Sequence, residues 1–224
     1  MSRALPYCAF LEGPQISLPA TGVDGASVQK MAPEVLRLLW SEVEWPFHPE
    51  HMQKHAVEFH GVIHHIFRQV AVVPFRLLSV FEDAGALRAF IAEHADVFIA
   101  DLERLKSVVQ MECVIYPAPS KPQAAAASGT SYLQEKAGML RAVEQQVSQV
   151  QGALGNLARD VRIREAKSGT RIFVLVERGR EQEFRPMIER IPLPAHLSRR
   201  LSGPWPAAEF LSQQVQAPKA AEVK

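Results

Sequence analysis

The longest regular pattern in the chain is an apolar repeat in residues 131–160, which predicts one long helix in the second half of the chain. Apolar residues recur there at alternating spacings of three and four, and this spacing places them along one helix face. The stripe consists of Leu133, Ala137, Leu140, Val143, Val147, Val150, Leu154, Leu157 and Val161. Two interpretations are open: the stripe packs on a sheet of its own chain, or it forms an intermolecular coiled coil.

Short β-forming segments flank this helix. The expected order is a strand at 110–116, the long helix, strands at 161–167 and 171–178, a helix at 179–190 and an edge strand at 199–203. Ser168-Gly169 between the two middle strands is a hairpin signal. The order strand, helix, strand, strand, helix, strand predicts a ferredoxin-like (βαββαβ) domain, with both helices on one face of a four-stranded antiparallel sheet.

The first half of the chain predicts a separate α+β unit. The expected elements are a strand at 3–12 interrupted by Pro6, an ambiguous strand or helix at 35–43, a helix at 49–70, extended segments at 71–74 and 77–81, and a helix at 82–106 broken near Ala95-Asp96. The helix at 49–70 is the clearest, because its apolar residues share one stripe and Pro49 suits a first helical turn.

The fold class is therefore α+β with two domains. We expect an N-terminal α+β domain at 1–107, the ferredoxin-like domain at 108–211 and a flexible tail at 212–224. Residues 117–128 hold three prolines and an alanine run, which predicts a loop rather than an element.

Composition excludes several classes of function. The formal net charge of the 224 residues is only +1, which argues against a nucleic-acid or membrane-surface binder. No window reaches the roughly 20 apolar residues that span a bilayer, and the N-terminus lacks the apolar core of a signal peptide. The two cysteines, Cys8 and Cys113, lie in apolar segments and are expected to be buried thiols. We therefore expect a cytoplasmic protein.

A group of histidines is the main candidate for metal chemistry. His51 and His55, like His60 and His64, stand four apart and can share a helix face. In the zinc-protease motif H-E-x-x-H the glutamate is the general base, whereas here Gly61 follows His60. Either the histidines are solvated or packing residues, or they hold a metal. With no complete catalytic motif and no cofactor-binding motif in the sequence, we expect neither an enzyme nor a cofactor.

Two further segments stand out. Residues 71–81 (AVVPFRLLSVF) are apolar except for Arg76, a cation that needs a partner or an exposed position. Residues 201–210 (LSGPWPAAEF) contain a rigid Gly-Pro-Trp-Pro turn that presents the indole of Trp205. Trp205 either packs on the sheet and locks the chain end or contacts a partner. In the packing case, Trp205→Ala is expected to cost about 2–4 kcal/mol of stability.

These segments, in this order, resemble the GvpF/GvpL family of gas vesicle proteins over roughly residues 3–211. The resemblance is carried by the histidine-bearing helix, by residues 72–81 (VVPFRLLSVF), by residues 128–133 (SGTSYL) and above all by residues 202–210 (SGPWPAAEF). The chain departs from the family pattern at Leu78, Gly61 and Ala207-Ala208, where the family usually has Gly, Glu and Pro-Tyr.

The resemblance implies a gas-vesicle-associated accessory protein that supports assembly by binding the apolar shell protein GvpA and other accessory proteins. A shell subunit with a gas-facing apolar surface would aggregate before assembly, and a helper could cover it with apolar contacts or a free sheet edge. We take Phe75, Arg76, Trp205 and Phe210 as candidate partner-binding residues. The alternative is a metal-binding or ligand-sensing cytoplasmic α+β protein that uses the histidine-rich helix.

Overall fold

The structure is a computed structural model that describes residues 1–13, 15–32, 35–118, 129–166 and 169–212. The chain divides into two compact units. The first contains Met1–Ser107 together with the residues from Pro206 onward, and the second contains Val108–Trp205. The segment 206–211, which the sequence analysis assigns to the second domain, therefore belongs to the first unit. The reason is that the Phe210 carbonyl accepts from Arg104 of the first unit's second helix and the Phe210 side chain is fully buried, as described below.

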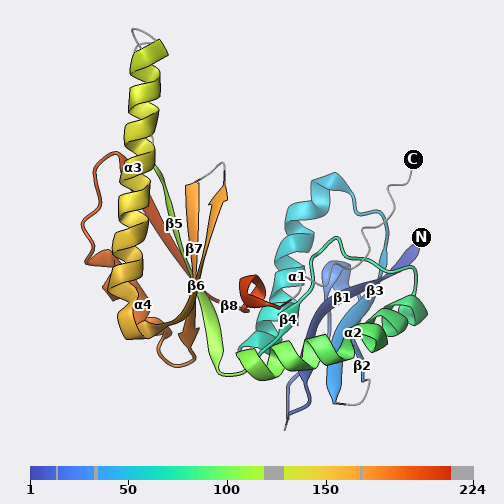
Figure 1. The fold of residues 1–224 in the computed structure, drawn as a ribbon. Helices are drawn as coiled ribbons and strands as arrows, with labels where there is room; N and C mark the ends of the chain where they lie inside the picture. The colour runs from blue at the N-terminus through green and yellow to red at the C-terminus, as the bar shows by residue number, and fades with distance from the viewer. Residues whose placement is uncertain (14, 33–34, 119–128, 167–168, 213–224) are drawn as a thin grey trace. The chain divides into compact units, whose positions relative to one another are not determined.

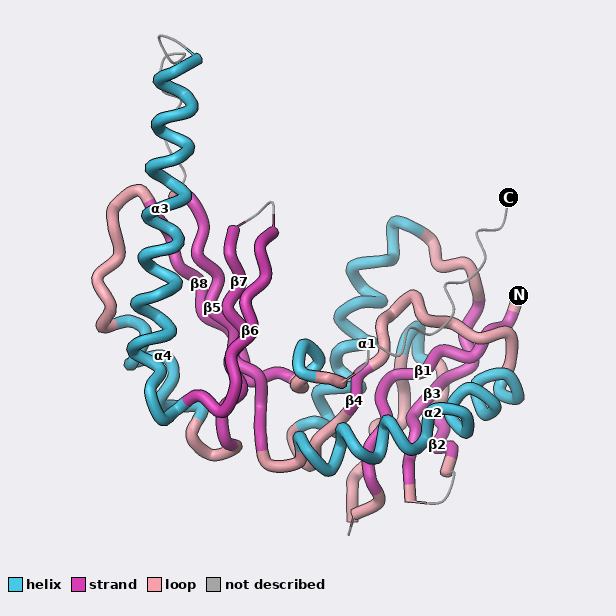
Figure 2. Tube along the Cα trace, in the orientation of Figure 1, coloured by secondary structure: helices cyan, strands magenta, loops and turns pink. Residues whose placement is uncertain are grey.

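The first unit is a four-stranded antiparallel sheet with two long helices (Figures 1 and 2). Its elements are β1 (Ser2–Leu11), β2 (Gln29–Met31), β3 (Leu36–Glu44), α1 (Met52–Phe67), β4 (Val73–Pro74) and α2 (Ala84–Leu105), with short 3₁₀ turns at Val23–Gly25, Pro49–His51 and Ala208–Phe210. The strand order is β2-β3-β1-β4. Both helices contact β1, and this strand is buried along nearly its whole length.

Four expectations for this unit meet a definite outcome. The ambiguous residues 35–43 form strand β3. Pro6 does not end β1, because the register shifts between Pro6 and Cys8 and this bulge absorbs the proline. The expected break in α2 near Ala95 is wrong, since no breaker is present and the buried positions continue on both sides of it. Residues 77–81 do not form a strand; only Phe81 makes an isolated bridge, to Ala4.

The second unit is also a four-stranded antiparallel sheet with two helices. Its elements are β5 (Val108–Pro117), α3 (Gly129–Leu154), a 3₁₀ turn (Gly155–Leu157), β6 (Ala158–Ala166), β7 (Gly169–Glu177), α4 (Glu181–Glu189) and β8 (Leu197–Trp205). The strand order is β6-β7-β5-β8, so β6 and β8 are the two edges of this sheet within the described chain. Helix α3 ends earlier than expected, because Gly155 adopts a left-handed φ of 43° and β6 begins at Ala158.

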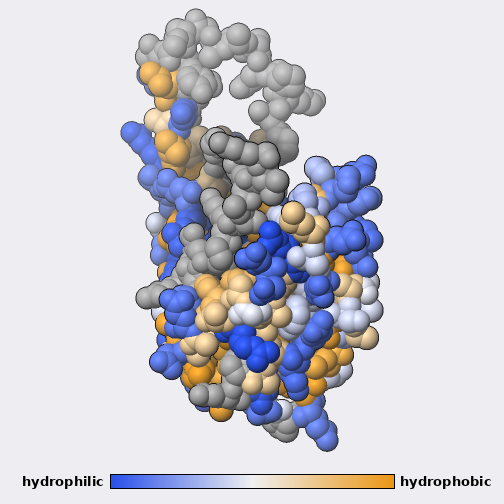
Figure 3. Space-filling view, turned by 90° about the vertical axis from the view of Figure 1, so that its right-hand side faces the viewer, coloured by the Kyte–Doolittle hydropathy of each residue, from blue (hydrophilic) through white to orange (hydrophobic). Residues whose placement is uncertain are grey.

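The apolar stripe of α3 divides into two parts. Val147, Val150 and Leu154 are buried, so the C-terminal half of the helix packs within its own unit. Leu133 and Leu140 are 65% and 57% exposed. Figure 1 shows the N-terminal half of α3 extending beyond the sheet, and in Figure 3 hydrophobic residues alternate with hydrophilic ones along it. Packing on the chain's own sheet therefore accounts for only one half of the stripe, and a coiled coil through the other half stays a prediction.

Candidate partner-binding site

Gly203 fixes the end of β8. Its φ is +117°, a conformation that side chains other than glycine rarely adopt. A Cβ atom at this position would stand 2.9 Å from both the carbonyl oxygen of Gln110 and the Sδ of Met111. The pairing of β5 with β8 shifts register between Gln110 and Glu112, directly beside this glycine. The close approach of β8 to β5 therefore depends on glycine, and it sets the path of Pro204 and Trp205 at the end of β8.

A chain of polar contacts holds Trp205. Its Nε1 donates to the Oγ of Ser202 at 3.2 Å, and Ser202 donates to Oε2 of Glu112 at 2.9 Å. The other carboxylate oxygen of Glu112 accepts from Nε of Arg171 at 2.5 Å, and the Arg171 guanidinium lies 5.2 Å from the centre of the Phe173 ring. Glu112 is buried, so this charge is compensated by a cation and a hydroxyl, as burial requires.

The indole itself remains accessible. Trp205 is 45% exposed, so it does not lock the chain end as a packed plug. Ser202, Glu112 and Arg171, the polar residues that orient the indole, are not among the residues predicted from the sequence. One signal for them was present: Glu112 is the only charged residue in the strand segment QMECVIY.

A cavity of about 270 Å³ lies between α4 and β8, next to this segment. Its walls are mostly apolar and come from one strand of the sheet interior, the first turns of α4 and the end of β8. The lining residues are Met111, Glu181, Gln182, Phe184, Arg185, Pro186, Leu201, Ser202, Gly203 and Pro204. Three residues of the most specific sequence motif, from Ser202 to Pro204, thus form one side of a hollow.

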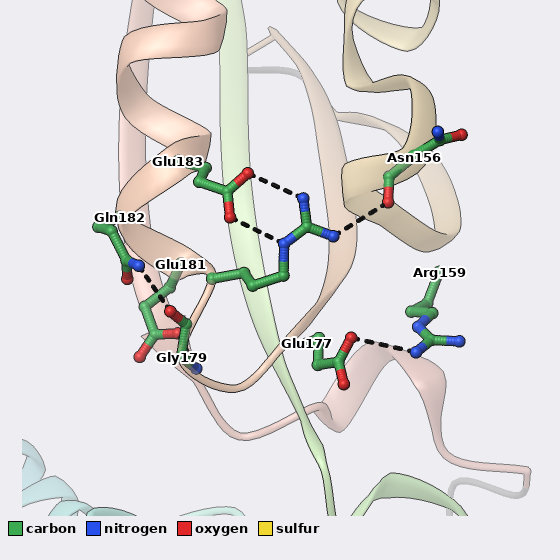
Figure 4. A network of polar contacts seen from close by, with 8 residues as sticks. Asn156, Arg159, Glu177, Gly179, Glu181, Gln182 and Glu183 are labelled. Atoms are coloured by element: carbon green, nitrogen blue, oxygen red, sulfur yellow. Dashed lines mark hydrogen bonds and ion pairs between the residues drawn. The ribbon is translucent and has the colours of Figure 1, made fainter.

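Polar contacts at the turn before α4 hold that helix in place (Figure 4). Arg180 makes two bonds of 2.8 Å to the carboxylate of Glu183 and a longer one, 3.4 Å, to the carbonyl oxygen of Asn156 in the 3₁₀ turn that follows α3. Gln182 donates to the carbonyl oxygen of Gly179 at 2.6 Å. Pro186 is accommodated inside α4 without ending it. The helix side of the cavity is therefore tied to the rest of its unit.

Phe210 has a different environment from Trp205. Its side chain is fully buried in the first unit, so the ring is covered by its own chain and is not presented at the surface. The Nη2 of Arg104 in α2 donates to the Phe210 carbonyl oxygen at 2.6 Å and to Asp101 at 2.6 Å. Asp101 also accepts from the backbone N–H of Ser212 at 3.0 Å. Phe210 is an anchor that fastens the closing segment to α2.

The other two candidates, Phe75 and Arg76, follow β4 in the first unit. Phe75 is half-buried, with its ring 5.8 Å from that of Phe98 and its backbone N–H donating to the carbonyl of Tyr7 at 2.9 Å. Arg76 is exposed. Trp205 belongs to the second unit, so the four predicted residues do not form one constellation within a single unit.

The histidines do not converge. His55 is buried, with its Nε2 2.7 Å from Oδ2 of Asp24 and its ring 4.6 Å from that of Phe47. The hydrogen bond from Lys54, assisted by the charge of His55, lowers the pKa of Asp24 below its usual value. Among the residues that the structure describes, no three His, Cys, Asp or Glu side chains are grouped closely enough to hold a metal ion.

Both cysteines are free and buried, which confirms the prediction made for them. Burial raises the pKa of the Cys8 thiol, and burial likewise raises that of Cys113 to about 12. Of the helices described, none is long and apolar enough to cross a membrane.

These observations define a mixed α+β protein with two four-stranded antiparallel sheets and an exposed tryptophan at the end of its last strand. The chain belongs to the gas vesicle synthesis protein GvpL/GvpF family, whose model matches residues 5–212.

Solved structures show the same fold. The crystal structure of the gas vesicle protein GvpF from Anabaena sp. PCC7120 is 12% identical, with a TM-score of 0.77 over 95% of this chain and 97% of that one. The gas vesicle protein GvpF from Microcystis aeruginosa is 13% identical, with a TM-score of 0.73 over 94% of this chain and 99% of that one. A comparison with curated protein sequences finds no match.

Proposed function

We propose that this protein is a non-enzymatic, cytoplasmic accessory factor of gas vesicle assembly that binds the small apolar shell protein GvpA and other accessory proteins. Membership of the gas vesicle synthesis family is the observation that carries the proposal. Physical chemistry supports it, because a subunit with an apolar gas-facing surface needs that surface covered before it is assembled.

The exposed side chains of the candidate site support a binding role. Trp205 presents a large amphipathic ring held by polar contacts, and tryptophan is enriched where proteins bind each other most strongly. We retain Trp205, Arg76 and the exposed part of Phe75 as partner-contact residues. Phe210 instead fastens the segment that follows Trp205.

We also infer that the second unit is a ferredoxin-like domain. Its element order is strand, helix, strand, strand, helix, strand, and its first strand, β5, pairs with both β7 and β8 in the sheet. In that assignment the domain ends at Trp205, and the closing segment returns to the N-terminal domain.

Gene deletion and capture test the function together. Deleting the gene should abolish or deform gas vesicles, and tagged protein co-expressed with GvpA should retain it on an affinity resin. Trp205→Ala should weaken this capture, whereas Val57→Ala, which truncates a 68% exposed apolar residue on α1, should not. Normal vesicles in the deletion strain together with absent capture would overturn the proposal.

The alternative of a metal-binding or ligand-sensing protein has less support. His55, the buried histidine of the group, contacts the carboxylate of Asp24, and the described residues hold no group of three potential ligands. Elemental analysis of the purified protein separates the two functions, because a metal-dependent protein must carry zinc or iron in stoichiometric amount.

A further inference from the structure

The outer edge of β8, beside the cavity, pairs with no other strand in the described part of the chain. In an antiparallel strand the N–H and C=O of one residue point to the same side, and successive residues alternate. The carbonyl of His196 accepts from Ala118, on the β5 side, whereas the carbonyl of Leu201 faces Arg185, on the other side. The backbone groups of Arg199 and Leu201 therefore point outward, away from the sheet.

A displaceable side chain covers this edge. The Nη2 of Arg185 reaches the Leu201 carbonyl at 3.5 Å, which is the long limit of a hydrogen bond. Arg185 is 60% exposed and also pairs with Glu189 at 3.3 Å. An incoming backbone N–H can replace this weak contact, and Arg185 then keeps its carboxylate partner.

The two faces of β8 differ in chemistry. Leu201 lines the cavity together with Phe184, Pro186 and Met111. Arg200 and Ser202 alternate with Leu201 and therefore lie on the opposite face, where Ser202 meets Glu112. Arg200 is exposed. Arg199 shares the face of Leu201, but its guanidinium is bonded to the Ile191 carbonyl. A strand added to this edge would meet the mostly apolar hollow on one face and the exposed Arg200 on the other.

We propose that the β8 edge binds an extended segment of a partner protein by strand addition, with an apolar side chain in the cavity and an acidic side chain beside Arg200. The cavity of about 270 Å³ lies just below the range of roughly 300–1,000 Å³ that small-molecule ligands occupy, so it suits one or two side chains. Main-chain bonds supply affinity in this mode, and pockets for alternate side chains supply specificity. The choice of a protein partner rests on the proposed function.

The opposite edge of the same sheet, strand β6, is a less suitable site for strand addition than β8. Strand β6 is equally long but carries Arg159, Asp160, Arg162, Arg164 and Glu165, a mixture of charges of the kind that protects edges from pairing. The cavity borders β8, and none of its lining residues in the described chain comes from β6. An apolar cavity beside an edge strand does nothing to prevent unwanted strand pairing. It can, however, receive a side chain of a bound segment.

The test uses a displayed library of short linear peptides selected on the purified full-length protein. Enriched peptides should share an apolar residue flanked by acidic ones. Gln182→Trp, an exposed change at the cavity wall, should fill the cavity and weaken binding at least about tenfold. Arg200→Glu should weaken it about three- to tenfold, with a larger effect at low salt.

Matched changes elsewhere serve as controls. Gln145→Trp on α3 and Arg190→Glu after α4 alter exposed residues that do not line the cavity, and both should bind like the wild type. Loss of binding in Arg200→Glu alone would still support the proposal if Gln182→Trp failed to fold. An absence of enriched peptides, or equal binding by wild type and both variants, would overturn it.

Two other results separate this inference from the proposed function. Peptide binding in the cavity, with normal vesicles in the deletion strain and no capture of GvpA, would support the site and overturn the function. Capture of GvpA that both variants leave unchanged would support the function and overturn the site. A wild-type dimer that Gln182→Trp dissociates, with no competing peptide, would reassign the edge to a second copy of the chain.

Discussion

Trp205 and Phe210 stand five residues apart in one motif, and the structure gives them opposite environments. Trp205 ends β8 of the second unit and is 45% exposed, whereas Phe210 is completely buried in the first unit, with its carbonyl bonded to Arg104 of α2. The chain passes from one unit to the other between Trp205 and Pro206. An aromatic-rich motif can therefore hold both a fastening residue and a presented residue, and residue type alone does not say which is which.

The polar contacts around the two residues sharpen this contrast. Those at Phe210 bond its backbone, through Arg104, and so hold the chain. The contact at Trp205 bonds its side chain, through Ser202 and Glu112, and so holds the ring. We expect changes at Phe210 to affect stability first and changes at Trp205 to affect binding first.

Phe210→Ala should have the largest effect on stability. Removing a fully buried phenylalanine ring leaves a cavity, and we expect the free energy of unfolding to fall by about 3–5 kcal/mol. Chemical denaturation measures this loss, with the smaller Phe210→Leu change as a graded control. A loss no larger than that of Trp205→Ala would show that Phe210 is not the anchor.

Gly203→Ala should have the next largest effect. The positive φ alone costs about 1–3 kcal/mol for a residue with a side chain, and the new Cβ would crowd Met111 and the Gln110 carbonyl. Denaturation of Gly203→Ala beside Gly138→Ala, a helical glycine with open space around it, isolates this strain. Equal stability of the two variants would contradict the close approach of β8 to β5.

Trp205→Ala should change stability only slightly. About half of the side chain is already in water, so we expect a loss of about 1 kcal/mol in place of the 2–4 kcal/mol that a packed indole would give. The same denaturation series measures it. A loss above about 3 kcal/mol would restore the interpretation of Trp205 as a packed plug.

Thiol reagents should label neither cysteine in the intact protein. In destabilised variants, the order in which the two cysteines are labelled should show which unit opens first. At pH 8 the raised pKa of Cys113, about 12, keeps that thiol protonated, and burial raises the pKa of Cys8 as well. Neither should react until the protein unfolds. Phe210→Ala should expose Cys8 before Cys113, and Gly203→Ala should do the reverse, as mass mapping of the labelled residues would show. Labelling of both thiols in the native wild type would contradict the burial of β1 and β5.

The sequence predicted the elements that depend on local pattern and missed the features that depend on distant partners. The helix of 131–160 and the following hairpin are visible in residue spacing. The predicted break near Ala95 is wrong because the buried stripe of α2 continues on both sides of it. The bond between Ser202 and Glu112 joins residues 90 positions apart, so no local pattern reveals it. For the same reason, nothing near Phe210 indicated that Arg104 would bind its carbonyl.

The two halves of α3 make the same point. One spacing runs through Leu133, Leu140, Val147 and Leu154, but only the last two are buried. Periodicity predicts a helix and its apolar face, whereas the length of the neighbouring sheet decides how much of that face is covered.

Capture of GvpA by wild type and Trp205→Ala, with unfolding followed on the same preparations, tests the central claim most directly. We predict that the wild type retains GvpA, and that Trp205→Ala loses most of this retention while its unfolding curve stays within about 1 kcal/mol of the wild type. Equal retention by the two proteins, or a loss of retention that only follows a loss of stability, would contradict the claim.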